Sequence, residues 1–252
     1  MTSTLILCLD APMQSWGVSS RFDRRDTARE PTKSGIVGLL ASALGVARDD
    51  DDRVRELATL LMGVRADREG ELERDFHTVS NVPNTEGGAR ATVVSERFYL
   101  SGALFLVALE GADAEVRGLY RALRRPRWPL FLGRKAFPPG TPVVHPDESR
   151  AVHDGHVDDV LEGHPWLETR PAQLRRARER LDAGTPLHLR TVRDTVPIFV
   201  GAELRHDHPI SFSARRRHHG TRAVRVDYVP LIAPMLPRQS ETTLKSERAG
   251  TA

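Results

Sequence analysis

Cysteine is almost absent from this sequence of 252 residues, in which Cys8 is the only one. A single thiol excludes a disulfide framework and a zinc site built from cysteines. We find no apolar run of about eighteen residues and no signal peptide, so we expect a cytoplasmic protein without a membrane-spanning helix. The acidic run Asp49–Asp52 has no spaced histidine or aspartate partner and fits a helix start. We therefore expect no metal and no cofactor.

A glycine-rich phosphate loop is absent as well. Lys33 and Ser34 precede an apolar helical pattern, but residues 26–32 contain none of the glycines with which a P-loop wraps phosphates. This absence excludes a P-loop NTPase.

The sequence does contain a strong helix signal at residues 31–45. The spacing of the apolar residues predicts a core helix of about three turns, with Ser34 as N-cap and Gly45 as the C-terminal cap. The first turn has free backbone N–H groups, to which Thr32, Lys33 and Ser34 would add donors. A phosphate would bind well there, although a plain capped helix explains the pattern equally well.

The first strand and this helix are expected to pack closely. Leu5–Leu9 is a continuous apolar run, which predicts a strand buried on both faces. Gly38 lies inside the predicted helix, where glycine costs roughly 1 kcal/mol relative to alanine. We infer that another backbone, from this strand or the loop after it, approaches Gly38.

Positive charge is present in excess and is clustered. The formal net charge is +3, and residues 117–135 contain seven Lys or Arg and no acid. Residues 205–225 contain six Arg and four His, with Asp207 as the only acid. Clustered charge favours a polyanionic partner, although arginine-rich faces are also common without one.

A loop of about twenty residues between the first strand and the helix combines arginines with an amide and aromatic rings. This combination suits single-stranded RNA, because phosphates take the charge and bases stack on rings or guanidinium planes. The alternative is a solvated loop with Trp16 in the core.

The elements that follow predict an α+β fold. Residues 75–100 read as a long hairpin, and residues 103–111 as another buried strand. A helix follows and stops at Pro126, before a short strand at Pro129–Leu132. The order predicts a ferredoxin-like (RRM-like) domain over residues 1–140 with an inserted hairpin. Residues 141–236 predict a less regular αβ region, and residues 237–252 a disordered tail.

Three adjoining blocks carry a family resemblance: LDAPMQSWG, SRFDRRDT and PTKSGIVGLLASALG. With DFHTV, RFYLSGALFLVALEG and FLGRKAFPP further on, they resemble the CasD family, the 5′-handle-binding subunits of type I-E CRISPR Cascade in the repeat-associated RNA-binding superfamily. The likeness covers roughly the first 140 residues. It implies a thumb hairpin that wedges into bound RNA, with a tip around residues 84–90 that is mobile without RNA.

The resemblance implies a non-catalytic RNA-binding subunit for antiviral defence. Its partners would be the 5′ handle of CRISPR RNA, the backbone and large subunits of Cascade and, indirectly, target DNA, with no membrane. The residues that we expect to contact RNA are Gln14, Trp16, Arg21, Arg24, Arg25, Thr32, Lys33, Ser34, Arg97, Arg134 and Lys135.

An alternative is a metal-independent endoribonuclease that processes precursor RNA, as some relatives do. His77 would be its catalytic residue, with Lys33 and Arg21 or Arg97 holding the developing charge. A packed or solvent-facing histidine is the more usual outcome in a strand, and the HTV motif resembles the non-catalytic group.

Overall fold

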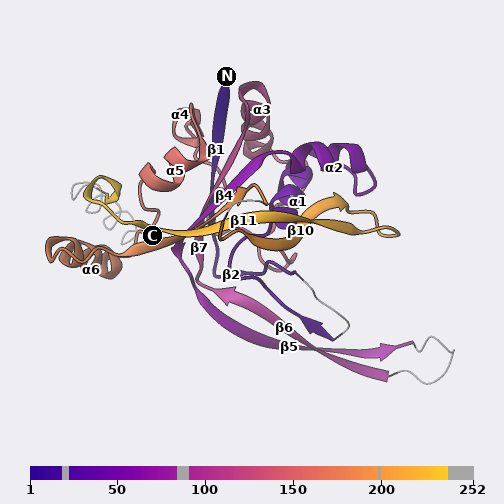
Figure 1. The fold of residues 1–252 in the computed structure, drawn as a ribbon. Coiled ribbons are helices and arrows are strands. Elements are labelled where there is room, and N and C mark those ends of the chain that lie inside the picture. The colour runs from indigo at the N-terminus through magenta and orange to yellow at the C-terminus, as the bar shows by residue number, and fades with distance from the viewer. Residues whose placement is uncertain (19–22, 84–90, 198–199, 238–252) are drawn as a thin grey trace.

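The computed structural model describes residues 1–18, 23–83, 91–197 and 200–237 (Figure 1). These residues form two sheets and the helices around them. The larger sheet has the strand order β10-β11-β9-β4-β7-β1-β8, and each pair of neighbouring strands is antiparallel. The smaller sheet has the order β2-β6-β3, with β5 also paired to β6. No helix in these ranges is both long and apolar enough to cross a membrane.

The larger sheet consists of β1 (Thr2–Asp10), β4 (Leu61–Arg68), β7 (Leu104–Ala112), β8 (Val152–His153), β9 (His188–Thr195), β10 (Glu203–Ser211) and β11 (His218–Pro230). The smaller sheet consists of β2 (Met13–Gln14), β3 (Arg24–Arg25), β5 (Glu71–Val82) and β6 (Ala91–Ser101). The helices are α1 (Lys33–Leu44), α2 (Asp51–Ala58), α3 (Asp113–Arg124), α4 (Glu148–Ala151), α5 (Val157–Gly163), α6 (Pro171–Asp182) and the 3-10 turn Ala233–Met235.

The core lies on both faces of β1 and β7, as expected for strands that are apolar throughout. Successive side chains of β7 point to opposite faces, so Phe105 and Val107 pack in the main core with α1, α2 and α3. Leu106 and Ala108 pack on the other face, against α5. The buried strand predicted at Leu5–Leu9 and the mixed α+β fold are confirmed.

Three local predictions are wrong. Pro129–Leu132 forms no strand, and the strand that pairs with the free side of β1 is β8 instead. The N-cap of α1 is Thr32 rather than Ser34, because the Thr32 side chain accepts from the Gly35 N–H. No atom lies within 4 Å of a Cβ built on Gly38, so no backbone approaches that glycine.

The predicted long hairpin is confirmed as β5 and β6, which continue β4 and β7 out of the body of the molecule (Figure 1). Gly70 and Gly102 lie where each arm leaves the larger sheet, with φ of 74° and 62°. Such angles suit glycine, so these two positions allow the chain to turn between the sheets. The predicted tip at residues 84–90 lies outside the described residues.

The C-terminal strands extend the larger sheet. Strand β9 pairs with β4 through Gly63, Val64 and Arg65, so the sheet runs across the expected boundary near residue 140. A smaller apolar cluster lies under α6 and includes Trp166 and Met235. The division into two regions remains a prediction, and most of the predicted tail lies outside the described residues.

Candidate nucleic-acid interface

Three arginines from separate segments meet at the base of the hairpin. Arg25 in β3 lies opposite Arg97 in β6, in a parallel pairing. Arg134 reaches the same place from a loop, where its Nη2 donates to the Phe98 carbonyl at 2.7 Å and to the Arg25 carbonyl at 3.2 Å. We call Arg25, Arg97 and Arg134 the arginine cluster.

The electrostatics of Arg134 reflect this crowding. Partial burial lowers the pKa of the Arg134 guanidinium, and the charges of Arg97 and Arg25 lower it further, with Asp75 acting in the opposite sense. Like charges held this close repel one another, so a bound phosphate would relieve the repulsion.

The loop that carries Arg134 is shaped by one glycine. Gly133 has φ of 95°, and a Cβ there would lie 1.7 Å from the Ser15 carbonyl oxygen. The loop closes on itself, since the Leu132 N–H donates to the Phe137 carbonyl and the Phe137 N–H to the Arg134 carbonyl. This close approach, possible only for glycine, fixes Arg134 beside β6.

Aromatic rings border the arginine cluster. Tyr99 and Phe137 lie with ring centroids 5.9 Å apart, and the Arg134 guanidinium lies 5.6 Å from the Phe137 centroid. Tyr99 is two residues from Arg97 and therefore shares its face of β6. Phe137 is buried and supports both neighbours, whereas Tyr99 is half-buried. A cation next to an accessible ring is the combination with which proteins hold single-stranded RNA.

His77 lies on this face, opposite Ser95. Its Nε2 is 2.6 Å from Asp75 Oδ2, and both side chains are about half exposed. His77 is the only histidine, and lysine is absent, among residues 71–83 and 91–101.

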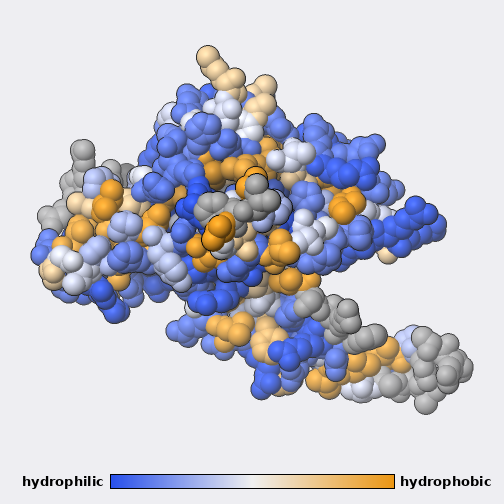
Figure 2. All heavy atoms as spheres, in the orientation of Figure 1, coloured by the Kyte–Doolittle hydropathy of each residue, from blue (hydrophilic) through white to orange (hydrophobic). Residues whose placement is uncertain are grey.

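The opposite face of the hairpin is different in character. There Arg24 lies over the Phe98 ring and Arg74 over the Phe76 ring, each 4.8 Å from the centroid. Figure 2 shows apolar side chains among polar ones along the hairpin. Of the large apolar residues exposed on the hairpin, Leu72, Phe76 and Val94 lie on this face, and Val79 and Val93 lie on the face of Arg97.

The phosphate site expected at the start of α1 is occupied by the protein itself. The Lys33 N–H donates to Asp207 Oδ2 at 2.8 Å, and Arg222 donates to both oxygens of Asp207 at 2.7 and 3.0 Å. Burial alone would raise the pKa of Asp207, but the Arg222 and Lys33 contacts outweigh it and lower the pKa. The helix end thus receives an anion, and that anion is a carboxylate.

The expectation that Lys33 is exposed is wrong. Lys33 is only 5% exposed, and its Nζ donates to Asp194 Oδ2 at 2.6 Å and to the Leu60 carbonyl at 2.7 Å. Asp194 also pairs with Arg222. Lys33, Asp194, Arg222 and Asp207 form one buried network of alternating charge, which we call the charge network.

Gln14 and Trp16 are also buried, which contradicts their expected exposure to RNA. Gln14 Nε2 donates to the Leu9 and Ala103 carbonyls, each at 2.9 Å, and Trp16 Nε1 donates to Gln14 Oε1 at 3.3 Å. The Trp16 ring packs against Gly35, where a Cβ would lie 2.8 Å from it. These two residues therefore support the loop from inside, as in the alternative considered for Trp16.

The other expected residues are distributed as follows. Thr32 is buried as the α1 N-cap, and Ser34 is half-buried beside it. Lys135 is exposed next to Arg134, and Arg21 lies outside the described residues. Tyr99 and Phe137 were not predicted as neighbours of the expected arginines. The blocks RFYL and FLGRKAF nevertheless contain both rings close to Arg97 and Arg134.

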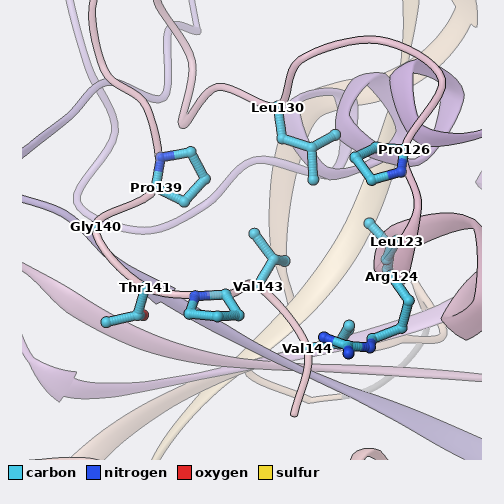
Figure 3. Close-up of a pocket in the computed structure, with 10 residues that line it drawn as sticks. Leu123, Arg124, Pro126, Leu130, Pro139, Gly140, Thr141, Val143 and Val144 are labelled. Atoms are coloured by element: carbon cyan, nitrogen blue, oxygen red, sulfur yellow. The ribbon is translucent and has the colours of Figure 1, made fainter. Parts of the chain in front are cut away.

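A hollow of about 450 Å³ lies elsewhere, between the end of α3 and the segment before α4 (Figure 3). Most of the residues that line it are of apolar types, and Arg124 is the only charged one among them. None of the residues expected to bind RNA contributes to it.

Comparisons with known proteins agree with one another. The family model "CRISPR-associated protein (Cas_Cas5)" matches residues 4–225. The "CRISPR system Cascade subunit CasD" of Escherichia coli (strain K12) is 36% identical over an alignment of 160 residues that covers 58% of this chain and 70% of that protein.

Two solved structures are similar along nearly the whole chain. One, described as "Crystal structure of Cas protein", is 38% identical with a TM-score of 0.67, over 90% of this chain and 95% of the other. The second, a chain of a "CRISPR RNA-guided surveillance complex", is 29% identical with a TM-score of 0.74, over 98% of each chain.

Proposed function

The chain belongs to the Cas5 family of CRISPR-associated proteins, and we propose that it is the subunit of a CRISPR surveillance complex that holds the 5′ handle of the CRISPR RNA. The observation that carries the proposal is the arginine cluster, in which Arg25, Arg97 and Arg134 converge beside Tyr99 and Phe137. The cations would bind handle phosphates and the Tyr99 ring would stack on a base, while buried Phe137 supports Tyr99 and Arg134 from below.

The assembly part of the proposal is supported by the similar proteins. CasD is named as a Cascade subunit, and the full-length structural match is a chain of an RNA-guided surveillance complex. The proposed partners are therefore the backbone subunits and the large subunit of Cascade. Target DNA would be an indirect partner, because it pairs with the bound RNA.

In this proposal, β1, β4, β7 and β8 with their connecting helices form a ferredoxin-like unit. The order β4-β7-β1-β8, with α1 and α2 before β4 and α3 before β8, supports that assignment. The hairpin then extends β4 and β7, which are the second and third strands of the unit along the chain.

The subunit acts without cleaving RNA. General acid–base cleavage needs one group to take a proton and another to supply one. On the described part of the hairpin, His77 is the only histidine, and its Nε2 faces Asp75, so no second histidine there could supply the other proton. Repeat RNA should stay intact with excess protein in EDTA, for the natural chain and for His77→Ala; cleavage by the natural chain alone would establish the nuclease alternative.

Binding of handle RNA tests the arginine cluster directly. Arg97→Ala and Arg134→Ala should each weaken binding and reduce the salt slope of the affinity by about 0.7 units, the value of one phosphate contact on a single strand. Arg24→Ala is the matched control, because Arg24 stacks on Phe98 on the opposite face. Equal losses in all three variants, or a loss in Arg24→Ala alone, would refute the placement.

A further inference from the structure

The turn between β10 and β11 carries a run of exposed cationic side chains outside the hairpin. Arg215, Arg216 and Arg217 are consecutive, exposed and followed by exposed His218. None of the three arginines forms a salt bridge with another described residue. Figure 2 shows strongly hydrophilic residues at the end of the turn, where β10 and β11 project from the body.

The one acid in the same stretch of sequence does not offset this charge. Asp207, the only acid in residues 205–225, is buried and already bound by Arg222 and the Lys33 N–H. The three arginines are therefore exposed and form no ion pair with a described carboxylate, and the mutual repulsion of like charges destabilises the fold slightly.

The turn is held in place from below. Phe212 packs against the main core and lies 6.3 Å from the His219 ring, centroid to centroid. The Arg216 N–H donates to the Ser213 carbonyl within the turn. Anchoring of this kind fixes the backbone of the turn and reduces the entropy that binding would cost.

Protection of a sheet edge does not explain these charges. Strand β10 is an edge strand, and Arg205 within it can discourage pairing with other chains. Arg215, Arg216 and Arg217 lie beyond the ends of both strands, where no unpaired ladder needs protection.

We propose that the turn Ala214–His219 is a second nucleic-acid-binding site, which contacts the phosphodiester backbone of RNA or DNA without reading sequence. Guanidinium groups are the side chains best suited to phosphate, through paired N–H donors. The turn and the hairpin leave the body toward the same side (Figure 1), so a strand held at the hairpin would continue within reach of this site.

Two variants of equal charge test the proposal. The first changes Arg215, Arg216 and Arg217 to Gln. The control changes Arg175, Arg176 and Arg180 on α6 to Gln, which removes the same charge at the opposite end of the molecule (Figure 1). The probes are a single-stranded RNA unrelated to CRISPR repeats and a duplex DNA, each titrated with the full chain over a range of salt concentrations.

The turn variant should lower the salt slope by about 2 units for the single strand and by about 3 for the duplex, at roughly 0.7 and 0.9 per lost contact. A change with only one probe identifies that nucleic acid as the partner. Arg→Lys at the same three positions should retain most of the slope, and thermal melting confirms folding. Unchanged slopes, or equal changes in the α6 variant, would overturn the proposal. The handle site is tested separately, because the arginine cluster is intact in every variant.

Discussion

The ammonium group of Lys33 is held by Asp194 in a region where the two side chains are only 7% and 12% exposed. Without Lys33, Asp194 keeps Arg222, but the buried network then has two carboxylates and one cation. Breaking a buried ion pair in this way typically costs about 3–5 kcal/mol. We predict that Lys33→Met lowers the free energy of unfolding by that order in chemical denaturation. Exposed Lys135→Met is the control and should have little effect. A Lys33→Met variant with unchanged stability that no longer binds handle RNA would instead show that Lys33 contacts RNA.

Two glycines of α1 differ sharply in their surroundings. A Cβ on Gly35 would lie 2.8 Å from the Trp16 ring, whereas a Cβ on Gly38 meets nothing within 4 Å. We therefore predict that Gly38→Ala raises the free energy of unfolding by about 0.5–1 kcal/mol, through the helix propensity of alanine. Gly35→Ala should lower it, because the Trp16 ring must move. Thermal melting of both variants checks this, and a destabilised Gly38→Ala would contradict the geometry.

At the scale of elements, the hairpin depends on the two turns at its base. Gly70 and Gly102 both have positive φ, but only Gly70 is crowded, with a Cβ 2.8 Å from the Ser101 carbonyl oxygen and from Ala103 Cβ. Gly102→Ala should cost about 1–2 kcal/mol for the left-handed backbone. Gly70→Ala should cost more and increase hydrogen exchange along β5 and β6. Equal effects would show that crowding at Gly70 is unimportant.

Elements defined by local pattern could be predicted from the sequence, and their long-range partners could not. The apolar runs, the helix caps near Gly45 and Asp50, and the long hairpin follow from neighbouring residues. The burial of Lys33 depends on Asp194 and Asp207, whose distance along the chain hides the pairing. Likewise, the sequence shows that these arginines are present. Only the fold shows that Arg25, Arg97 and Arg134 meet and that Arg24 lies on the other face of the hairpin.

At the scale of the whole molecule, the C-terminal strands support the N-terminal region in two ways. Strand β9 covers the edge of β4, and the charge network joins Lys33 to Asp194 and Asp207. We predict that residues 1–140 alone do not unfold in a single cooperative transition, because they expose that edge and leave Lys33 unpaired. The full chain is the reference, in calorimetry and chemical denaturation. A cooperative transition of comparable stability would show that the region folds independently.

The central claim is that the Arg97 face of the hairpin contacts the 5′ handle in the assembled complex. The most direct measurement is photo-crosslinking from a benzoyl-phenylalanine at Tyr99, on that face, with the same group at Phe76, on the opposite face, as the control. The account predicts that Tyr99 crosslinks to handle nucleotides and that Phe76 does so far more weakly. Handle crosslinks from Phe76 alone, or crosslinks from Tyr99 to other parts of the RNA only, would contradict it.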